Sequence, residues 1–255
     1  MQVTEYSVPG CPVSISLVSD LHQKPYGAVL DSLREKRPDI ICVAGDFLWG
    51  VLPKRELAVR EAGVLPFFAG CAALAPCFVS LGNHEWLITD GDLRAIRETG
   101  AQVLDDDFSV LEHKGTRLVF GGLTSSYLSE CRRLVAQGLG QYEAHMKTRD
   151  SSKAPPRLGW LDGYCREPGY RILLSHHPEY YPRYLKNRDI PLILSGHAHG
   201  GQIRIFGQGL FAPSQGVLPR LTSGVKDGRL VISRGLANCQ KVPRLFNPPE
   251  LVYIR

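Results

Sequence analysis

The sequence Ser195-Gly196-His197-Ala198-His199-Gly200-Gly201-Gln202 follows an apolar run, residues 190–194, that predicts a short buried strand. Two histidines two residues apart therefore stand at a strand end, a rigid position from which imidazole can bind a metal ion. The two glycines after them allow the backbone to turn sharply. One such pair is weak evidence alone. It gains weight because four other apolar strands also end in Gly or Ser followed by Asp, Asn or His.

These strand ends supply a set of candidate functional side chains. They are Asp20 and His22 after Val13–Ser19, Asp46 after Ile40–Ala44, Asn83 and His84 after Cys77–Leu81, His176 after Arg171–Ser175, and His197 and His199 after Ile190–Leu194. A helix cap or a polar turn would explain any one of them. Jointly they indicate a site, because α/β folds build sites at the carboxyl ends of their strands.

The donor types narrow the chemistry of this site. Carboxylate, imidazole and amide donors without thiolate favour Mn, Fe, Zn or Ni and argue against a structural zinc site. Seven candidate ligands, the set above without His84, are too many for one ion and suit two ions that share a carboxylate. Paired ions about 3.5–4 Å apart are a recurring device for the hydrolysis of phosphate esters.

The rest of the chain changes from a strand–helix–strand rhythm to a hairpin rhythm. We expect helices over Ala28–Lys36, Lys54–Ala75, Asp92–Glu98 and Pro178–Asn187, and further strands over Gln102–Leu104, Phe108–Glu112, Arg117–Phe120, Arg229–Ser233 and Leu251–Ile254. Residues 1–255 are interpreted as a single domain. Residues 124–169 contain seven basic residues and little periodicity, which favours a solvated excursion over the alternative of a lid that shapes specificity. His113 and His145 lie in ordinary polar contexts and are assigned no role.

Composition bounds the class of protein. The net charge of +5 is compatible with anionic substrates and is no nucleic-acid signature. Seven scattered cysteines predict reduced thiols. Residues 62–81 lack charge, but prolines and glycines interrupt them, which predicts a buried helix and a strand rather than a membrane span. With no apolar signal segment after Met1, we expect a cytoplasmic protein, with peripheral membrane association and the oligomeric state left open.

The ordered motifs D-x-H, G-D, G-N-H-E, S-H and G-H-x-H over residues 20–199 resemble those of the calcineurin-like metallophosphoesterases. The extended motif Gly196-His197-Ala198-His199-Gly200-Gly201-Gln202 and the run at residues 244–250 further resemble a bacterial phosphohydrolase branch, whose members often carry a membrane anchor or export signal that is not seen here. The resemblance implies a four-layer α-β-β-α sandwich of two mixed β-sheets flanked by helices.

The resemblance also implies a role for each residue. Asp20, His22 and His199 would hold one divalent metal ion, with Mn²⁺ expected and Fe, Zn, Ni or Mg as alternatives. The second ion would be held by Asn83, His176 and His197, and Asp46 would bridge the two. His84 would lie near the leaving-group oxygen, as a general acid or a stabiliser of the transition state.

One departure from the family pattern concerns His84. Many relatives continue the second motif as G-D-x-x-D, and the second aspartate orients the histidine, but Trp49 stands there in this chain. Glu85 is either a substitute for that aspartate or a supporting carboxylate. A weaker acid would favour substrates with good leaving groups, such as aryl esters or pyrophosphates.

The expected function is hydrolysis of phosphodiester or pyrophosphate bonds by in-line attack of a metal-bridging hydroxide. The substrate would be a small phosphate ester or a lipid- or sugar-linked one. A phosphomonoesterase using the same site is the first alternative. A non-catalytic scaffold that binds a protein partner is the second, and it predicts lost ligands, whereas all seven are present.

Overall fold

The computed structural model describes residues 1–49, 58–148, 154–238 and 242–255. Its first sheet has the order β1-β16-β2-β3-β4-β5, with β2, β3, β4 and β5 parallel. The strands are β1 (Gln2–Tyr6), β16 (Glu250–Ile254), β2 (Ile15–Val18), β3 (Ile40–Ala44), β4 (Cys77–Ser80) and β5 (Gln102–Val103). The last strand, β16, lies between β1 and β2, parallel to the former and antiparallel to the latter.

The second sheet has the order β14-β15-β9-β8-β7-β6, with parallel central strands and one antiparallel strand at each edge. Its strands are β14 (Gly224–Lys226), β15 (Leu230–Ile232), β9 (Leu192–Ser195), β8 (Tyr170–Ser175), β7 (Thr116–Leu123) and β6 (Asp107–His113). Both sheets are therefore mixed, and the ligand-bearing strands β2, β3, β4, β8 and β9 are central or nearly so.

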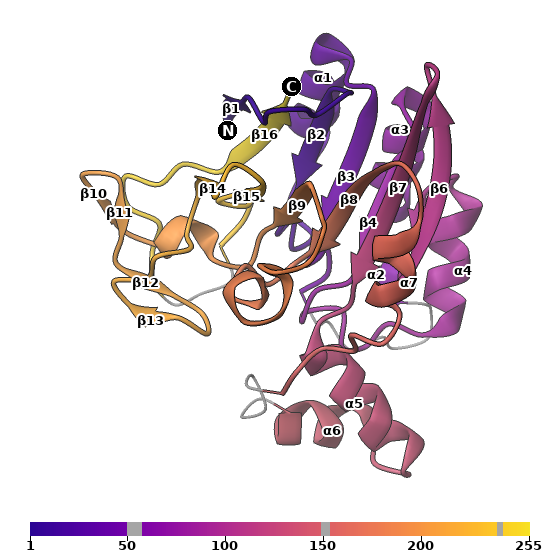
Figure 1. Ribbon diagram of the computed structural model, residues 1–255. Coiled ribbons are helices and arrows are strands. Elements are labelled where there is room, and N and C mark those ends of the chain that lie inside the picture. The colour runs from indigo at the N-terminus through magenta and orange to yellow at the C-terminus, as the bar shows by residue number, and fades with distance from the viewer. Residues whose placement is uncertain (50–57, 149–153, 239–241) are drawn as a thin grey trace.

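The two sheets pack face to face, and Figure 1 shows helices on their outer sides. Phe78 of β4 stacks on Phe120 of β7, with ring centroids 3.8 Å apart, in the core between the sheets. The outer face of the first sheet is covered by α1 (Gly27–Lys36), α2 (Ala58–Glu61), α3 (Leu65–Leu74) and α4 (Asp90–Glu98), and that of the second by α7 (Leu161–Arg166) and a π-helical turn, Tyr181–Leu185. The predicted four-layer sandwich is thus confirmed.

Local chemistry explains the ends of these helices. Thr89 and Asp92 form a capping box, in which each side chain accepts a hydrogen bond from the backbone N–H of the other, so α4 begins two residues earlier than predicted. The predicted helix Lys54–Ala75 is two helices, α2 and α3, and residues 54–57 lie outside the described part. Among the described residues, none of the helices combines the length and apolarity that crossing a bilayer requires.

Two segments extend from the sandwich. Residues 124–169 are more helical than expected: α5 (Ser126–Ala136) and α6 (Gln141–Thr148) project beyond the lower end of the strands in Figure 1. Two small hairpins, which the sequence did not predict, follow His197 and His199. They are β10 (Arg204–Ile205) with β11 (Gln208–Gly209), and β12 (Phe211–Ala212) with β13 (Gly216–Val217).

Candidate metal centre

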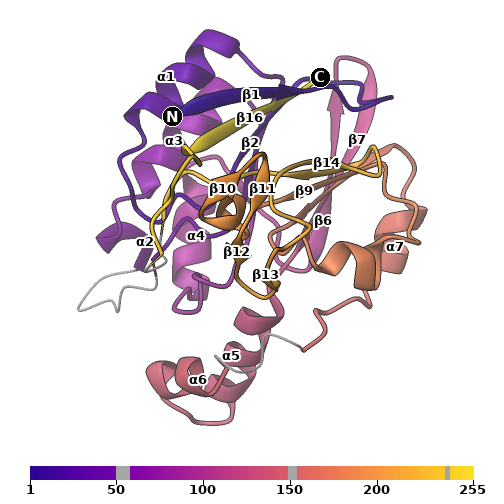
Figure 2. The same cartoon turned by 90° about the vertical axis from the view of Figure 1, so that its left-hand side faces the viewer.

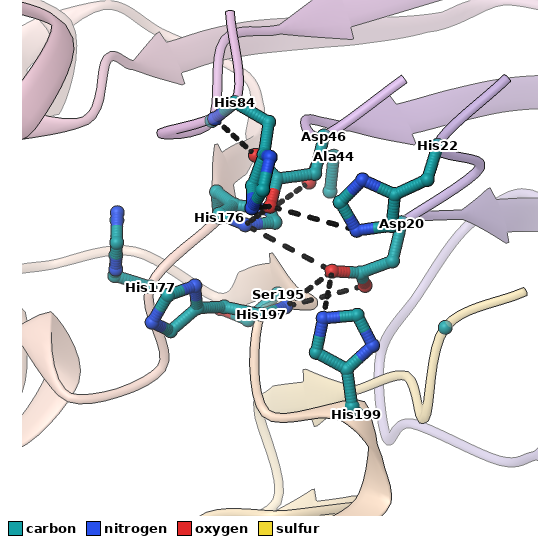
Figure 3. Close-up of polar contacts among 12 residues, drawn as sticks. Asp20, His22, Ala44, Asp46, His84, His176, His177, Ser195, His197 and His199 are labelled. Atoms are coloured by element: carbon teal, nitrogen blue, oxygen red, sulfur yellow. Dashed lines mark hydrogen bonds and ion pairs between the residues drawn. The ribbon is translucent and has the colours of Figure 1, made fainter. Parts of the chain in front are cut away.

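The loops after β2, β3, β4, β8 and β9 converge at one end of the two sheets, as Figure 3 shows. They bring together four groups of metal-capable side chains, and within each group the ligand atoms lie within 4.8 Å of one another. Three groups contain only candidate side chains: Asp20 with His22 and His199, His22 with Asp46 and His84, and Asp46 with His176 and His197. The fourth joins His197 to His177 and Glu179. Six of the seven ligands expected from the sequence are therefore in these groups, and Asp46 connects two of them.

Several donor atoms in this centre are buried without a hydrogen-bond partner. They are His22 Nε2, Asp46 Oδ2, Asn83 Oδ1 and His176 Nε2. His176 Nε2 is 3.0 Å from Asp46 Oδ2, but the pair does not have hydrogen-bond geometry. Unsatisfied buried polar atoms are costly, and all four belong to side chains predicted as ligands. These donor atoms therefore fit divalent metal ions, and Asn83, the seventh candidate, supplies one of the unsatisfied atoms.

Backbone carbonyls fix the orientation of three imidazoles. The Nδ1 atoms of His22, His176 and His199 lie 3.0, 2.7 and 3.0 Å from the carbonyl oxygens of Leu48, Ala44 and Ala237. A carbonyl oxygen only accepts, so each ring donates from Nδ1. In the neutral ring the lone pair is then on Nε2, the atom that faces the carboxylates. This is the arrangement by which proteins prepare histidine for metal binding.

Burial keeps part of the donor set neutral. It lowers the pKa of His22 to about 4, against the opposing effect of Asp46. Burial lowers the pKa of His197 well below its usual value, and the nearby His177 lowers it further. Neutral imidazole is the metal-binding form, so neither side chain has to lose a proton at pH 7 to bind an ion.

The backbone is strained at most of the candidate ligands. Asp20, His22, Asp46, His197 and His199 have φ angles between 44° and 64°, in the left-handed region. That region is costly for residues with a Cβ and is tolerated where the surroundings over-determine it. The strain was not predicted from the sequence. It indicates that the surrounding structure holds these five side chains in place.

Close approach of the loops requires glycine. A Cβ on Gly82 would lie 2.2 Å from Asp46 Oδ1, and one on Gly235, whose φ is +73°, would lie 2.6 Å from Asp20 Oδ2. Both distances are below any real contact of a Cβ atom. The G-N-H-E motif therefore begins with glycine because the Asp46 carboxylate packs directly against it.

Glu85 connects two of the ligand-bearing loops. Its carboxylate is fully buried and accepts hydrogen bonds from the backbone N–H groups of Asp46, Leu48 and Gly82, at 2.9, 2.9 and 2.7 Å. Of the two interpretations offered by the sequence, this geometry supports the second, in which Glu85 is a supporting carboxylate. Trp49 is 43% exposed, and its ring centroid is 6.4 Å from that of His22.

His84 is the most accessible member of the metal-capable groups. Its side chain is 24% exposed, whereas those of His22, Asp46 and His176 are almost fully buried. Its backbone N–H donates to Asp46 Oδ1 at 2.9 Å, and its Nε2 is 4.0 Å from Asp46 Oδ2. His84 thus lies at the solvent side of the centre, where a substrate would arrive.

Sequence reasoning missed a neighbouring group formed by Ser125, His177 and Glu179. His177 bonds through Nε2 to Ser125 Oγ at 2.8 Å, and its Nδ1 lies 3.2 Å from Glu179 Oε1. Its ring centroid is 4.1 Å from that of His197. A signal was present in the sequence, because His177 directly follows His176 at a strand end. Strand alternation would have pointed it to the other face, but β8 ends at Ser175.

The two histidines that were assigned no role lie elsewhere. His113 is 3.4 Å from Asp39, and the ring of His145 stacks on Trp86 with centroids 3.9 Å apart. Neither belongs to a metal-capable group within the described ranges. The stacking of His145 does show that α6 packs on the loop that carries His84. Arg132 and Arg133 of α5 pair with Asp105 and Glu130.

The fold and the paired groups of ligands define a metal-dependent phosphoesterase class. The family profile of the calcineurin-like phosphoesterases matches residues 13–201, and the chain belongs to that family. Its members use divalent metals, which agrees with the Asp and His groups of this centre. Membership indicates a metal-binding hydrolase of phosphate esters.

Relatives with similar sequences include the UDP-2,3-diacylglucosamine pyrophosphatase LpxG of Chlamydia muridarum, 26% identical over 93% of this chain and 82% of the relative. The uncharacterized protein YpbG of Bacillus subtilis is 24% identical over 94% and 79%. The phosphodiesterase YaeI of Escherichia coli is 22% identical over 76% and 63%. Among solved structures, a 5'-nucleotidase precursor from Thermus thermophilus has a TM-score of 0.48 at 16% identity, and the match covers 88% of this chain and 49% of that one.

Proposed function

We propose that this protein is a binuclear metal-dependent phosphohydrolase that cleaves phosphodiester or pyrophosphate bonds. The observation that carries the proposal is the position of Asp46. It belongs to one metal-capable group with His22 and to another with His176 and His197. Asp20, His22 and His199 would hold one ion, and Asn83, His176 and His197 the other. Two ions sharing a carboxylate would supply Lewis-acid stabilisation of phosphoryl oxygens and lower the pKa of bound water.

The protein side chains contribute positioning and proton transfer. The backbone carbonyls behind His22, His176 and His199 hold the three Nε2 atoms towards the carboxylates. His84, at the accessible side, is the group that can donate a proton to a departing oxygen. The donor set of nitrogen and oxygen atoms suits Mn²⁺, with Fe, Zn, Ni or Mg as alternatives.

The choice of diester or pyrophosphate rests on the leaving group and on the relatives. Trp49 stands where many relatives have the aspartate that orients the histidine, and Glu85 is engaged with backbone amides. Loss of that aspartate makes a weaker acid path, which substrates with stable leaving groups tolerate best. Two relatives are named a pyrophosphatase and a phosphodiesterase, which agrees with the proposal.

The test compares substrate classes on one preparation. The Mn²⁺-loaded protein is assayed with bis-p-nitrophenyl phosphate, p-nitrophenyl phosphate, and a sugar-linked and a lipid-linked pyrophosphate. We expect turnover of the diester or a pyrophosphate to exceed that of the monoester. A preference for the monoester would support the phosphomonoesterase alternative, and absence of turnover on all four with metal bound would support the scaffold.

A further inference from the structure

Large apolar side chains are concentrated on one side of the molecule. Within the described residues, fifteen large hydrophobic side chains are exposed, and eight of them lie in residues 205–218 and 242–246. They are Ile205, Phe206, Phe211, Val217, Leu218, Val242, Leu245 and Phe246, which we call the apolar tips. Phe206 is fully exposed and Phe246 is 85% exposed. Such a concentration indicates an interaction surface.

The two segments form one surface. Leu245 pairs with Ile203 in an isolated bridge, and the backbone N–H of Arg204 donates to the carbonyl of Leu245 at 3.0 Å. The backbone N–H of Leu218 donates to the carbonyl of Leu210 at 2.9 Å, and that of Leu210 donates to the carbonyl of Ile203 at 2.9 Å, so the end of the second hairpin is joined to the start of the first. Figures 1 and 2 show the hairpins β10–β11 and β12–β13 together, beside the sandwich.

The backbone at three apolar tips is unfavourable for the residue that it carries. Phe206, Leu218 and Phe246 have φ angles of 49°, 51° and 53°. Phe206 and Gly207, with φ of 83°, form the two-residue turn between β10 and β11, a turn that usually has Asn or Asp before the glycine. A bulky residue at such a position is an outlier. Strain at an exposed position finds no compensation in packing, which points to a use for the side chain outside the molecule.

The charge of the same segments has one sign. In the sequence, residues 200–226 contain three basic residues and residues 235–249 contain two, and neither range contains Asp or Glu. Arg204 and Arg244 are partly buried and donate to backbone carbonyls such as those of Gly200 and Ala237, whereas Arg220 is exposed. Apolar side chains on separate loop tips, with basic residues among them, match an anionic lipid surface.

A second copy of the chain fits this surface less well. A two-fold dimer would bring the basic residues of both copies together, and separate tips offer no complementary groove. A bilayer requires no shape complementarity, because each tip inserts on its own. Phe246 also lines a cleft of about 630 Å³ with Lys24, Arg244 and Ala237.

We propose that the apolar tips and their basic residues dock the protein on the surface of an anionic phospholipid bilayer. The surface adjoins the metal centre, because Ser214, in the loop between β12 and β13, lies 3.3 Å from His197 Nε2. Docking would hold the metal centre close to the lipid headgroups. Partitioning on vesicles is measurable without any hydrolysis, so its test stands apart from that of the proposed activity.

The experiment is sedimentation of the full chain with vesicles of phosphatidylcholine alone or mixed with phosphatidylglycerol. We expect the protein to sediment with the mixed vesicles and to be released by added salt. The double variant Phe206→Ser/Leu218→Ser should partition about 100-fold more weakly, because each of the two lost apolar side chains is worth about an order of magnitude. Arg220→Glu should weaken the preference for phosphatidylglycerol.

The matched control is Tyr142→Ser/Met146→Ser, which removes two exposed apolar side chains from α6, away from this surface. It should sediment like the wild type, and both double variants should keep the wild-type circular dichroism. Absence of sedimentation for the wild type would overturn the proposal. So would equal sedimentation of Phe206→Ser/Leu218→Ser, or a wild-type dimer that this variant converts to a monomer without any vesicle binding.

Discussion

Most non-glycine residues with positive φ lie in two regions of the described structure, the loops of the candidate metal centre and the apolar segments beside them. Asp20, Asp46 and His199 represent the first, and their side chains are buried and face one another. Phe206 and Leu218 represent the second, and their side chains face solvent. In the metal centre, contacts among buried side chains stabilise the strained backbone. In the hairpins, the strained residues point into solvent, and no packing within the protein offsets the strain.

The largest effect is expected for Asp46→Asn. Loss of the carboxylate shared by two ligand groups should lower turnover by about 10³-fold or more and remove at least one ion from a two-ion stoichiometry. Asp106→Asn is a matched control, since Asp106 has almost the same φ, 53° against 55°, outside the centre. Elemental analysis and assays on the Mn²⁺-loaded proteins check this, and unchanged metal content in Asp46→Asn would refute the bridging role.

The next effect concerns His84, which belongs to the centre but lacks backbone strain. Its contribution should depend on the leaving group, because it acts on the departing oxygen. His84→Ala should lower turnover of an alkyl ester by about 10²–10⁴-fold and that of a nitrophenyl ester much less. His113→Ala serves as the control. An equal, large loss on both esters, at unchanged metal content, would mean that His84 positions the phosphate instead.

A substitution at Glu85 tests whether its carboxylate stabilises the strained loops of the centre. Glu85→Gln places an amide N–H₂ against backbone donors, so the free energy of unfolding should fall by about 2–3 kcal/mol. Glu112→Gln, at an exposed position on β6, should change it little. Urea denaturation measures both. Stability equal to that of the wild type would show that the loops of Asp46 and Gly82 do not depend on this carboxylate.

The smallest effect is expected at the hairpin tip, with the opposite sign. Phe206→Asn supplies the residue that the turn favours, so the free energy of unfolding should rise by up to about 1 kcal/mol while vesicle binding weakens. Phe211→Asn, in β12, should not stabilise the protein. Thermal unfolding distinguishes them, and destabilisation by Phe206→Asn would show that the exposed ring has a partner within the fold.

The sequence predicted the ligand-bearing strands well. Each is a short apolar run that ends in Gly or Ser before a polar residue, as Ile40–Ala44 does before Gly45 and Asp46. The four-layer arrangement followed from the family resemblance. The candidate ligands were predicted because their order along the chain is a strong pattern, and the structure brings donor atoms of six of the seven together.

Other features lay beyond sequence reasoning for physical reasons. The strands of the two hairpins have two residues each, too short for an alternating pattern, and Phe206 stands where turn rules expect Asn or Asp. Glu179 was missed because its contacts with His177 and His197 depend on the fold around the centre. The helix α5 was hidden by its charged residues, although its buried positions, Leu128 and Cys131, are spaced as in a helix.

The place of β16 in the first sheet also governs how the protein assembles. This strand follows β2 by more than two hundred residues and lies between β1 and β2, and the backbone N–H of the nearby Ala237 donates to the carbonyl of Asp20. During synthesis, β2 emerges more than two hundred residues before β16. The edge of β2 that pairs with β16 therefore stays unpaired until β16 has been made. Pairings so distant along the chain fold slowly. The metal-binding ability should therefore appear only once residues 250–254 are free to pair with β2.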